Sequence, residues 1–354
     1  MTSSGSESTR QTVVLTTMPP LGQLYAKVAS GAVLSGLEHV ARGVLAGTPV
    51  PGHFLKNRGT DRSTPTTMQL PRVQIVVPAV GVDAAKHRAF CDVLQAPLRA
   101  DSAGNTIAFS GYLHALAFPA AMALMTRQDF PLPTVGLVHL SNHVEHRQPV
   151  TVGERLDVTV WAQNLQAHRA GTTVEVVAEL RRTPEGDGAG QGLAPVWVGR
   201  SVYLARGVQL GSEHSAHTSE SMDAQRHDHP PFHAPAPTAR WRLSADTGRR
   251  YAAVSGDVNP IHLSAPSARA LGMKAAIAHG MYTASRALAM VHAAPPMTWE
   301  VDFAAPLVLP SMVSVAVERD GRGQDLSAAK VTVWDGVKRR PHATLTVQRL
   351  PWSS

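Results

Sequence analysis

The residues best able to do chemistry lie in one short stretch, Tyr-Ala-Ala-Val-Ser-Gly-Asp-Val-Asn-Pro-Ile-His, which spans residues 251–262. Asp257 and His262 supply a carboxylate and an imidazole five positions apart, and such a pair can move protons to and from a substrate. The glycine before Asp257 can adopt backbone angles that a side chain would forbid, and the proline after Asn259 restricts both residues. We therefore expect one tight turn that fixes an acid/base pair, although the same residue types are common in ordinary turns.

A second stretch, Ile-Ala-His-Gly-Met-Tyr at residues 277–282, leads into an apolar run that continues to Val291 and predicts a buried helix. Gly280 lies at the start of that helix and has no Cβ. A ligand carbonyl could therefore approach its N–H closely, at the positive end of the helix dipole. His279 could cap the helix start or contact a ligand. The two stretches together offer an acid, a base and a donor for an oxyanion.

Together, the two stretches resemble the hydratase-2 motif of the MaoC-like (R)-specific enoyl-thioester hydratases and dehydratases. The signature over residues 251–262 is followed by Ala268 and then by His-Gly-Met. The resemblance implies a hot-dog fold, in which an antiparallel sheet wraps a long helix. It also implies that Asp257 and His262 are the catalytic pair, that Asn259 orients the reacting groups and that Gly280 binds the thioester carbonyl.

Three neighbours of these residues are further candidates for substrate contact: Ser255, His279 and Met281. A structural role in the turn is the preferred interpretation for Ser255, and Tyr251 is expected to pack in the core or to line the pocket.

The rest of the chain predicts an α+β protein with a double hot-dog fold, in which two long helices are each wrapped by antiparallel β-sheet. An apolar helix is expected at residues 107–126, and the run that starts at Met281 gives the second. Alternating and β-branched segments predict strands at 73–77, 138–144, 156–160, 174–180, 196–204, 298–303, 312–317, 328–334 and 343–347. Tyr112–Phe118, Phe130-Pro131 and the His139-x-x-Asn142-His143 strand also resemble, more weakly, the amino-terminal half of two-hot-dog MaoC-like dehydratases.

We divide the chain into four parts. Residues 1–70 are expected to hold a disordered N-terminus (Met1 to Thr17), an amphipathic helix (Leu21 to Ala46) and a linker. Residues 71–206 form an N-terminal hot-dog, 207–239 a linker rich in His, Pro and Ser, and 240–354 the catalytic hot-dog. The first hot-dog lacks the motif, because Asp92 has no imidazole five positions on. It is expected to complete the sheet and line an acyl tunnel, and His139, His143 and His146 on one of its strands are expected at a surface or interface.

The composition of the chain limits the kinds of partner and the compartment that are expected for it. The net charge is +7, but the basic residues are scattered without a nucleic-acid-binding motif, so no nucleic acid is expected. The apolar run at Leu21 to Ala46 is interrupted by charged residues, which argues against a membrane span. A helix packed on the domain surface is the preferred interpretation, and a weak interfacial membrane helix is the alternative. No signal peptide is recognisable. The only cysteine, Cys91, excludes an intrachain disulfide and favours a reducing, cytoplasmic setting. The histidine-rich linker has no regular ligand spacing, so no metal site is expected there. The reaction implied by the resemblance is expected to need no metal or cofactor, because a thioester already acidifies C2.

Three functions remain open at this point. The resemblance favours a hydro-lyase that hydrates trans-2-enoyl thioesters and dehydrates (R)-3-hydroxyacyl thioesters in fatty-acid metabolism, with the acyl group carried on coenzyme A or acyl carrier protein. The alternatives are a hot-dog acyl thioesterase and a non-catalytic acyl-thioester or acyl-carrier binding protein. The chain would be a pseudo-dimer that can form a homodimer. Which of Asp257 and His262 is the acid and which the base stays open.

Overall fold

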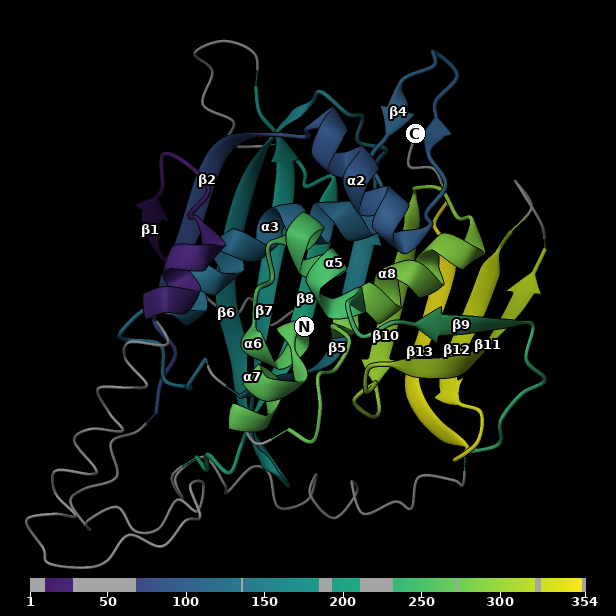
Figure 1. Ribbon diagram of the computed structural model, residues 1–354. Coiled ribbons are helices and arrows are strands. Elements are labelled where there is room, and N and C mark those ends of the chain that lie inside the picture. Colours follow the sequence, from purple (N-terminus) through teal and green to yellow (C-terminus); the bar gives the residue numbers. More distant parts are fainter. Residues whose placement is uncertain are drawn as a thin grey trace, which may run out of the picture.

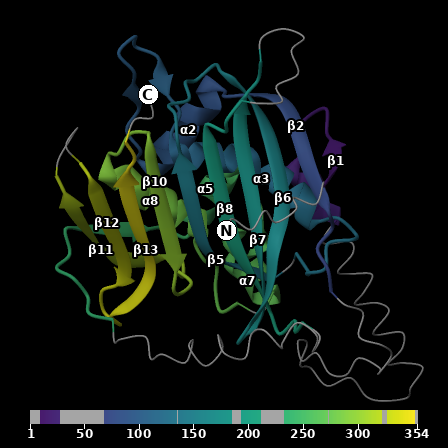
Figure 2. The same ribbon diagram turned by 180° about the vertical axis from the view of Figure 1, so that it is seen from behind.

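A single large sheet organises the protein. The computed structural model describes residues 10–27, 68–134, 136–184, 193–210, 232–271, 273–321 and 326–351. In these ranges an 11-stranded sheet has the order β1-β2-β6-β7-β8-β5-β10-β13-β12-β11-β9. The long helices cover one face of this curved sheet (Figure 1), and the view from behind shows the strands in front of them (Figure 2).

The first half of the sheet wraps helix α3 (Ser110–Met125), which is apolar on nearly all sides and buried along most of its length. Helix α2 (Ala84–Leu94) precedes it and is capped by Asp83, whose Oδ1 accepts from the Lys86 N–H at 2.8 Å. The strands of this half, in sheet order, are β2 (Val73–Gly81), β6 (Arg155–His168), β7 (Gly171–Arg182), β8 (Trp197–Arg206) and β5 (Leu137–His146). The short β3 (Arg99–Ala100) and β4 (Thr106–Ile107) pair between α2 and α3.

The second half repeats this plan around helix α8 (Gly280–Val291). Its strands, again in order from the outer edge to the centre, are β9 (Ala239–Leu243), β11 (Ser311–Asp320), β12 (Ala328–Asp335), β13 (Arg340–Arg349) and β10 (Met297–Phe303). Three helices lie between β9 and α8: α5 (Thr247–Ser255), α6 (Pro260–Leu263) and α7 (Ala265–Ala270). A strand, a helix, a long central helix and four strands therefore occur twice in the same order.

The two halves are joined by the antiparallel pairing of β5 with β10, in which Val144 lies opposite Trp299. The central helices also meet, because a Cβ on Gly111 of α3 would lie 2.5 Å from Ser285 Oγ of α8. Such a close approach requires glycine. Two helices, each wrapped by antiparallel strands of one continuous sheet, confirm the double hot-dog fold predicted from the sequence.

The expectation that residues 1–17 are disordered is wrong for the part that the structure describes. Strand β1 (Gln11–Val14) pairs in parallel with β2 at the outer edge of the sheet, and residues 21–27 form a helical segment. The strand escapes sequence analysis because its side chains are mostly exposed and show no alternation of apolar and polar residues. The remainder of the helix expected at Leu21 to Ala46, and all histidines of the 207–239 linker except His233, lie outside the described residues.

The expectation of a surface position is also wrong for two of the three histidines on β5. His146 is fully buried, and the Nε2 atom of His139 is buried as well, whereas His143 is 40% exposed and lies 4.0 Å from Glu300. The sequence did not reveal this burial. Side chains alternate between the two faces of a strand, but this alternation alone does not tell which face packs inward. All three lie on the strand that joins the halves. Among the described residues no helix is both long enough and apolar enough to cross a membrane.

Candidate active site

The 251–262 stretch is built from two helix ends rather than from one turn. Its first five residues form the end of α5, and its last three begin α6, so the tight turn expected from the sequence is confined to residues 256–259. Gly256 takes the left-handed conformation, with φ 76°, and ends α5. Asn259 is extended, with ψ 123°, as the residue before a proline should be. Asp257 thus lies in the turn, and His262 lies on α6.

Two polar side chains of the stretch stabilise its backbone. Ser255 Oγ donates to the Tyr251 carbonyl oxygen at 2.8 Å and accepts from the Asp257 N–H at 3.2 Å. Asn259 Oδ1 accepts from the Ile261 N–H at 3.3 Å and so caps the start of α6. These hydrogen bonds indicate that both side chains help to position the turn, which is the role preferred for Ser255 on sequence grounds.

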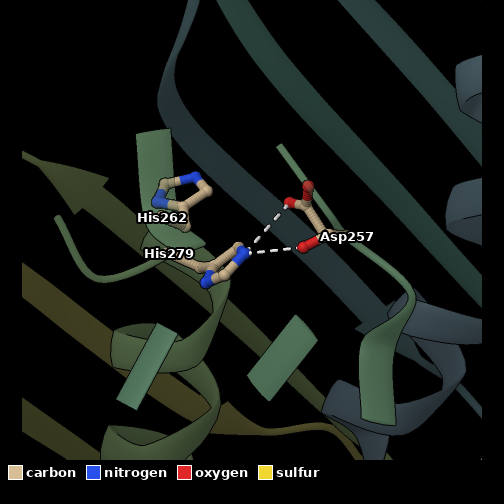
Figure 3. A group of neighbouring side chains, drawn as sticks. All are labelled: Asp257, His262 and His279. Carbon is tan, nitrogen blue, oxygen red and sulfur yellow. Dashed lines mark hydrogen bonds and ion pairs between the residues drawn. The ribbon is translucent and has the colours of Figure 1, made fainter. Parts of the chain in front are cut away.

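The fold brings Asp257, His262 and His279 together (Figure 3). One nitrogen of each imidazole and one carboxylate oxygen lie within 4.8 Å of one another. The two imidazole rings stack with their centroids 3.7 Å apart. His279 Nε2 lies 2.9 Å from the Asp257 carbonyl oxygen and 3.8 Å from Asp257 Oδ2. His279 therefore lies directly beside the predicted acid/base pair.

Backbone carbonyls fix the orientation of both imidazoles. His262 Nδ1 lies 2.8 Å from the Ile277 carbonyl oxygen, which can only accept, so Nδ1 carries the hydrogen and Nε2 keeps a lone pair. Burial lowers the pKa of His262, although Asp257 and the Ile277 carbonyl act in the opposite direction. Burial, together with His262, lowers the pKa of His279 to about 3. Both rings are therefore neutral near pH 7.

Asp257 is held as a carboxylate. Burial by itself would raise its pKa, but the neighbouring His279 and His262 and a hydrogen bond from Tyr25 bring the pKa below its usual value. The side chain is still 22% exposed, so a small molecule can reach it. The site at rest thus contains an anionic oxygen next to a neutral imidazole with a free lone pair.

Tyr25 is a site residue that sequence reasoning missed. Its hydroxyl donates to Asp257 Oδ1 at 2.5 Å, across a separation of 232 positions in the chain. Tyr25 belongs to the helical segment at residues 21–27, for which the sequence predicts an amphipathic helix and no role in the site. No local motif marks it, because a single tyrosine on such a helix is usually a packing residue.

Gly280 is the first residue of α8, and His279 is its N-cap with no side-chain cap hydrogen bond. The N–H groups of a first helical turn have no intrahelical acceptor, so the Gly280 N–H is available to a ligand. A Cβ here would lie 3.1 Å from Phe303 Cζ, so a side chain at this position would require a small shift of the Phe303 ring. Met281, the remaining candidate for substrate contact, is 8% exposed and packs in the core.

Comparison with known proteins identifies the family of the chain. Residues 224–339 match the model of the MaoC like domain. The chain is 32% identical over 318 residues to 3-hydroxyacyl-thioester dehydratase X of Mycobacterium tuberculosis, covering 89% of this chain and 99% of that protein. The chain belongs to the MaoC-like dehydratase family. A crystal structure of HtdX from M. tuberculosis superposes with a TM-score of 0.60 at 31% identity, over 78% of this chain and 99% of that one. A MaoC-like dehydratase from Phytophthora capsici shares the fold, with a TM-score of 0.54 at 17% identity over 80% of this chain and 96% of that one.

In this MaoC-like chain the first half also reaches the candidate site. His139 of β5 lies 4.5 Å from the ring of Tyr203 of β8 and 5.1 Å from that of Phe303, measured between centroids. Phe303 in turn is the side chain that faces Gly280. The start of α8 is thus enclosed by side chains from both halves, although the motif lies in only one.

Proposed function

We propose that this protein is a hydro-lyase that hydrates trans-2-enoyl thioesters to (R)-3-hydroxyacyl thioesters and catalyses the reverse dehydration. The observation that carries the proposal is the pairing of an ionised Asp257 with a neutral His262, within 4.8 Å of each other and next to the start of α8. This arrangement provides two proton acceptors beside one helix-terminal N–H. Such a set suits addition of water to a polarised double bond.

The thioester carbonyl would bind at the Gly280 N–H. When water adds at C3, negative charge develops on that carbonyl oxygen, and a donor already in place stabilises it without rearrangement. A single such donor lowers the activation free energy by roughly 3–4 kcal/mol. The missing Cβ at Gly280 lets the carbonyl approach the backbone beside Phe303.

His262 is the better candidate for the group that moves the proton. Neither group of the resting pair carries a proton at the atom that faces the substrate, so the proton delivered to C2 must be the one taken from water. An imidazole is ordinarily a stronger base than a carboxylate. His262 Nε2 would accept the proton as the hydroxyl adds to C3 and then return it to C2 on the same face. Dehydration reverses both steps.

Asp257 would hold the second hydrogen of the water and stabilise the transient imidazolium by its charge. His279 would keep this carboxylate and His262 in place, through its bond to the Asp257 backbone and its stacking on the imidazole. The acyl group would arrive on coenzyme A or acyl carrier protein, whose phosphates suit a chain of net charge +7. A second copy of the chain is not needed for this mechanism.

The test is the loss of enoyl-thioester absorbance, with thiol release followed in parallel. The wild type should hydrate the substrate without releasing thiol, and Asp257→Asn and His262→Ala should each lose about 10²–10⁴-fold in kcat. Asp92→Asn and His143→Ala are matched controls, because they remove an exposed carboxylate and an exposed imidazole of the first half. Thiol release without hydration would show a thioesterase, and neither reaction across chain lengths would favour a binding protein.

A further inference from the structure

The segment of residues 10–27 is anchored to the sheet far from the candidate site. The Gln11 N–H donates to the Arg72 carbonyl oxygen at 2.8 Å, and the Leu15 N–H donates to the Val76 carbonyl oxygen at 2.9 Å. The guanidinium of Arg10 lies 4.7 Å from the centre of the Trp161 ring. These contacts hold the first part of the segment on the sheet, and none of them involves the motif. The helical part of the segment extends from this anchored part to the motif.

The helical end then docks on the motif through Leu21. Leu21 is buried, and a Cβ on Gly256 would lie only 2.6 Å from its Cδ1 atom. Both the positive φ of Gly256 and the approach of this leucine therefore favour glycine at this position. Leu21 and Tyr25 are four residues apart and therefore lie on the same face of the helical segment. The contact at Gly256 directs Tyr25 to the next residue, Asp257.

The two oxygens of Asp257 have different surroundings. Oδ1 accepts from Tyr25 at 2.5 Å and from the Asn259 N–H at 3.3 Å, whereas the contact recorded for Oδ2 is the longer one to His279, at 3.8 Å. We propose that Tyr25 is a positioning residue for the reaction: its hydroxyl fixes Oδ1 and favours the ionised carboxylate, so that Oδ2 is turned toward the reacting water. This inference rests on the proposed function, and it makes residues 10–27 part of the active site.

The charges around the pair agree with Tyr25 as the donor. Burial, followed by the charge of Asp257, raises the pKa of Tyr25 far above its ordinary value, so the hydroxyl stays protonated at working pH. A donor to the ionised carboxylate lowers the carboxyl pKa, and removal of the donor raises it. Six other titratable groups act on Asp257 or Tyr25, and each comes from a different part of the fold: His262 of α6, His279 before α8, Tyr251 of α5, His114 of α3, His139 of β5 and Tyr203 of β8.

The first test is a direct titration that does not depend on turnover. Full-length protein labelled with ¹³C at the aspartate carboxyls is titrated by NMR, and the Asp257 signal is identified by its loss in Asp257→Asn. In Tyr25→Phe, which keeps the ring and removes only the hydroxyl, we expect the midpoint of Asp257 to rise by about one pH unit. An unchanged midpoint in a folded Tyr25→Phe protein overturns the inference, whether or not the wild type hydrates enoyl thioesters.

The second test is kinetic. Tyr25→Phe should lower kcat by about 10- to 100-fold with little change in KM, which is the range for a hydrogen bond to a charged group. Tyr112→Phe is the matched control, since Tyr112 is a buried tyrosine that packs against Phe90 and His87. A wild type without hydratase activity would refute the proposed function, whereas an active wild type with an equally active Tyr25→Phe would refute only the role of Tyr25. A faster Tyr25→Phe would show that the tyrosine blocks the site.

Discussion

The starts of helices α3 and α8 occupy corresponding places in the two halves, yet different side chains surround them. At the start of α3, Ser110 Oγ accepts from the indole N–H of Trp197 at 3.1 Å and from that of Trp299 at 2.9 Å. Both indoles are buried. At the start of α8 there is a glycine, beside a carboxylate and two imidazoles. The same helix terminus has thus become a packing site in one half and a candidate reaction site in the other.

The helices that precede these termini end in the same backbone conformation but are followed by different residues. Helix α2 ends at Gln95 with φ 56°, and α5 ends at Gly256 with φ 76°, so both end in the left-handed conformation. After Gln95 the chain continues with Ala96 and Pro97, whereas Gly256 is followed by Asp257. A shared backbone geometry therefore carries chemistry only where the side chains supply it, which teaches that the fold alone does not identify the active half.

Between the two helix starts, the largest expected effect comes from removing the N–H at the start of α8. Gly280→Pro removes the N–H, and proline suits the first position of a helix, particularly after His279, which is extended with ψ 139°. We expect kcat to fall by about 10²–10³-fold while the protein stays folded, measured by enoyl-thioester hydration and by circular dichroism.

Gly280→Ala is the control, because it keeps the N–H and adds only a methyl group 3.1 Å from Phe303 Cζ. Its loss of kcat should be much smaller than that of Gly280→Pro. Equal losses in the two variants would mean that space at this position matters and the N–H does not.

The next effect comes from removing the hydrogen-bond acceptor at the start of α3. Ser110→Ala leaves two buried indole N–H groups without their acceptor, and each unsatisfied donor costs about 1–3 kcal/mol. We expect the free energy of unfolding in urea to fall by about 2–6 kcal/mol, with kcat of the folded fraction retained. In a Trp299→Phe background the cost should be about half as large, and an unchanged cost there would contradict the shared role of Ser110.

A smaller effect tests the contact between Gly256 and Leu21. Gly256→Ala should cost about 1–2 kcal/mol for the left-handed conformation, plus the clash with Leu21 Cδ1, which would lie 2.6 Å from the new methyl. Unfolding of Gly256→Ala, Leu21→Ala and the double variant measures the coupling between them. The double variant should be more stable than the sum of the single losses predicts. Gln95 tolerates a side chain at a similar φ, so simple additivity would show that the leucine does not press on Gly256.

The smallest effect concerns the pH dependence of stability in the first half. Burial, with a contribution from Arg182, lowers the pKa of His146 to about 3. In the unfolded chain His146 binds a proton near pH 6.5, whereas the buried ring of the folded chain stays neutral to a much lower pH. The contribution of this neutral ring to the free energy of unfolding is therefore complete above pH 6.5 and is lost as the pH falls. The expected slope is up to about 1.4 kcal/mol per pH unit. His146→Leu should flatten urea-unfolding stability between pH 6 and 4, and an identical slope would contradict the burial of a neutral ring.

The sequence alone located the candidate site residues that lie close together along the chain. Asp257, His262 and Gly280 lie in two short stretches, and the apolar run after Gly280 is long enough to identify α8. The contribution of Tyr25 could not be predicted, because it depends on a contact between residues 232 positions apart. The same limit applies to β1, whose exposed side chains carry no periodic signal, and to His146, whose burial depends on which face of β5 turns inward.

The joining of β5 to β10 has a consequence for how such a protein changes over evolutionary time. In an assembly of two identical chains every substitution enters both copies at once, so neither helix start can be altered without the other. Here the two halves are different segments of one chain that share a sheet. Mutations can therefore accumulate at one helix start while the other is preserved, so Trp197, Ser110 and Trp299 can pack at the start of α3 without any change at the start of α8.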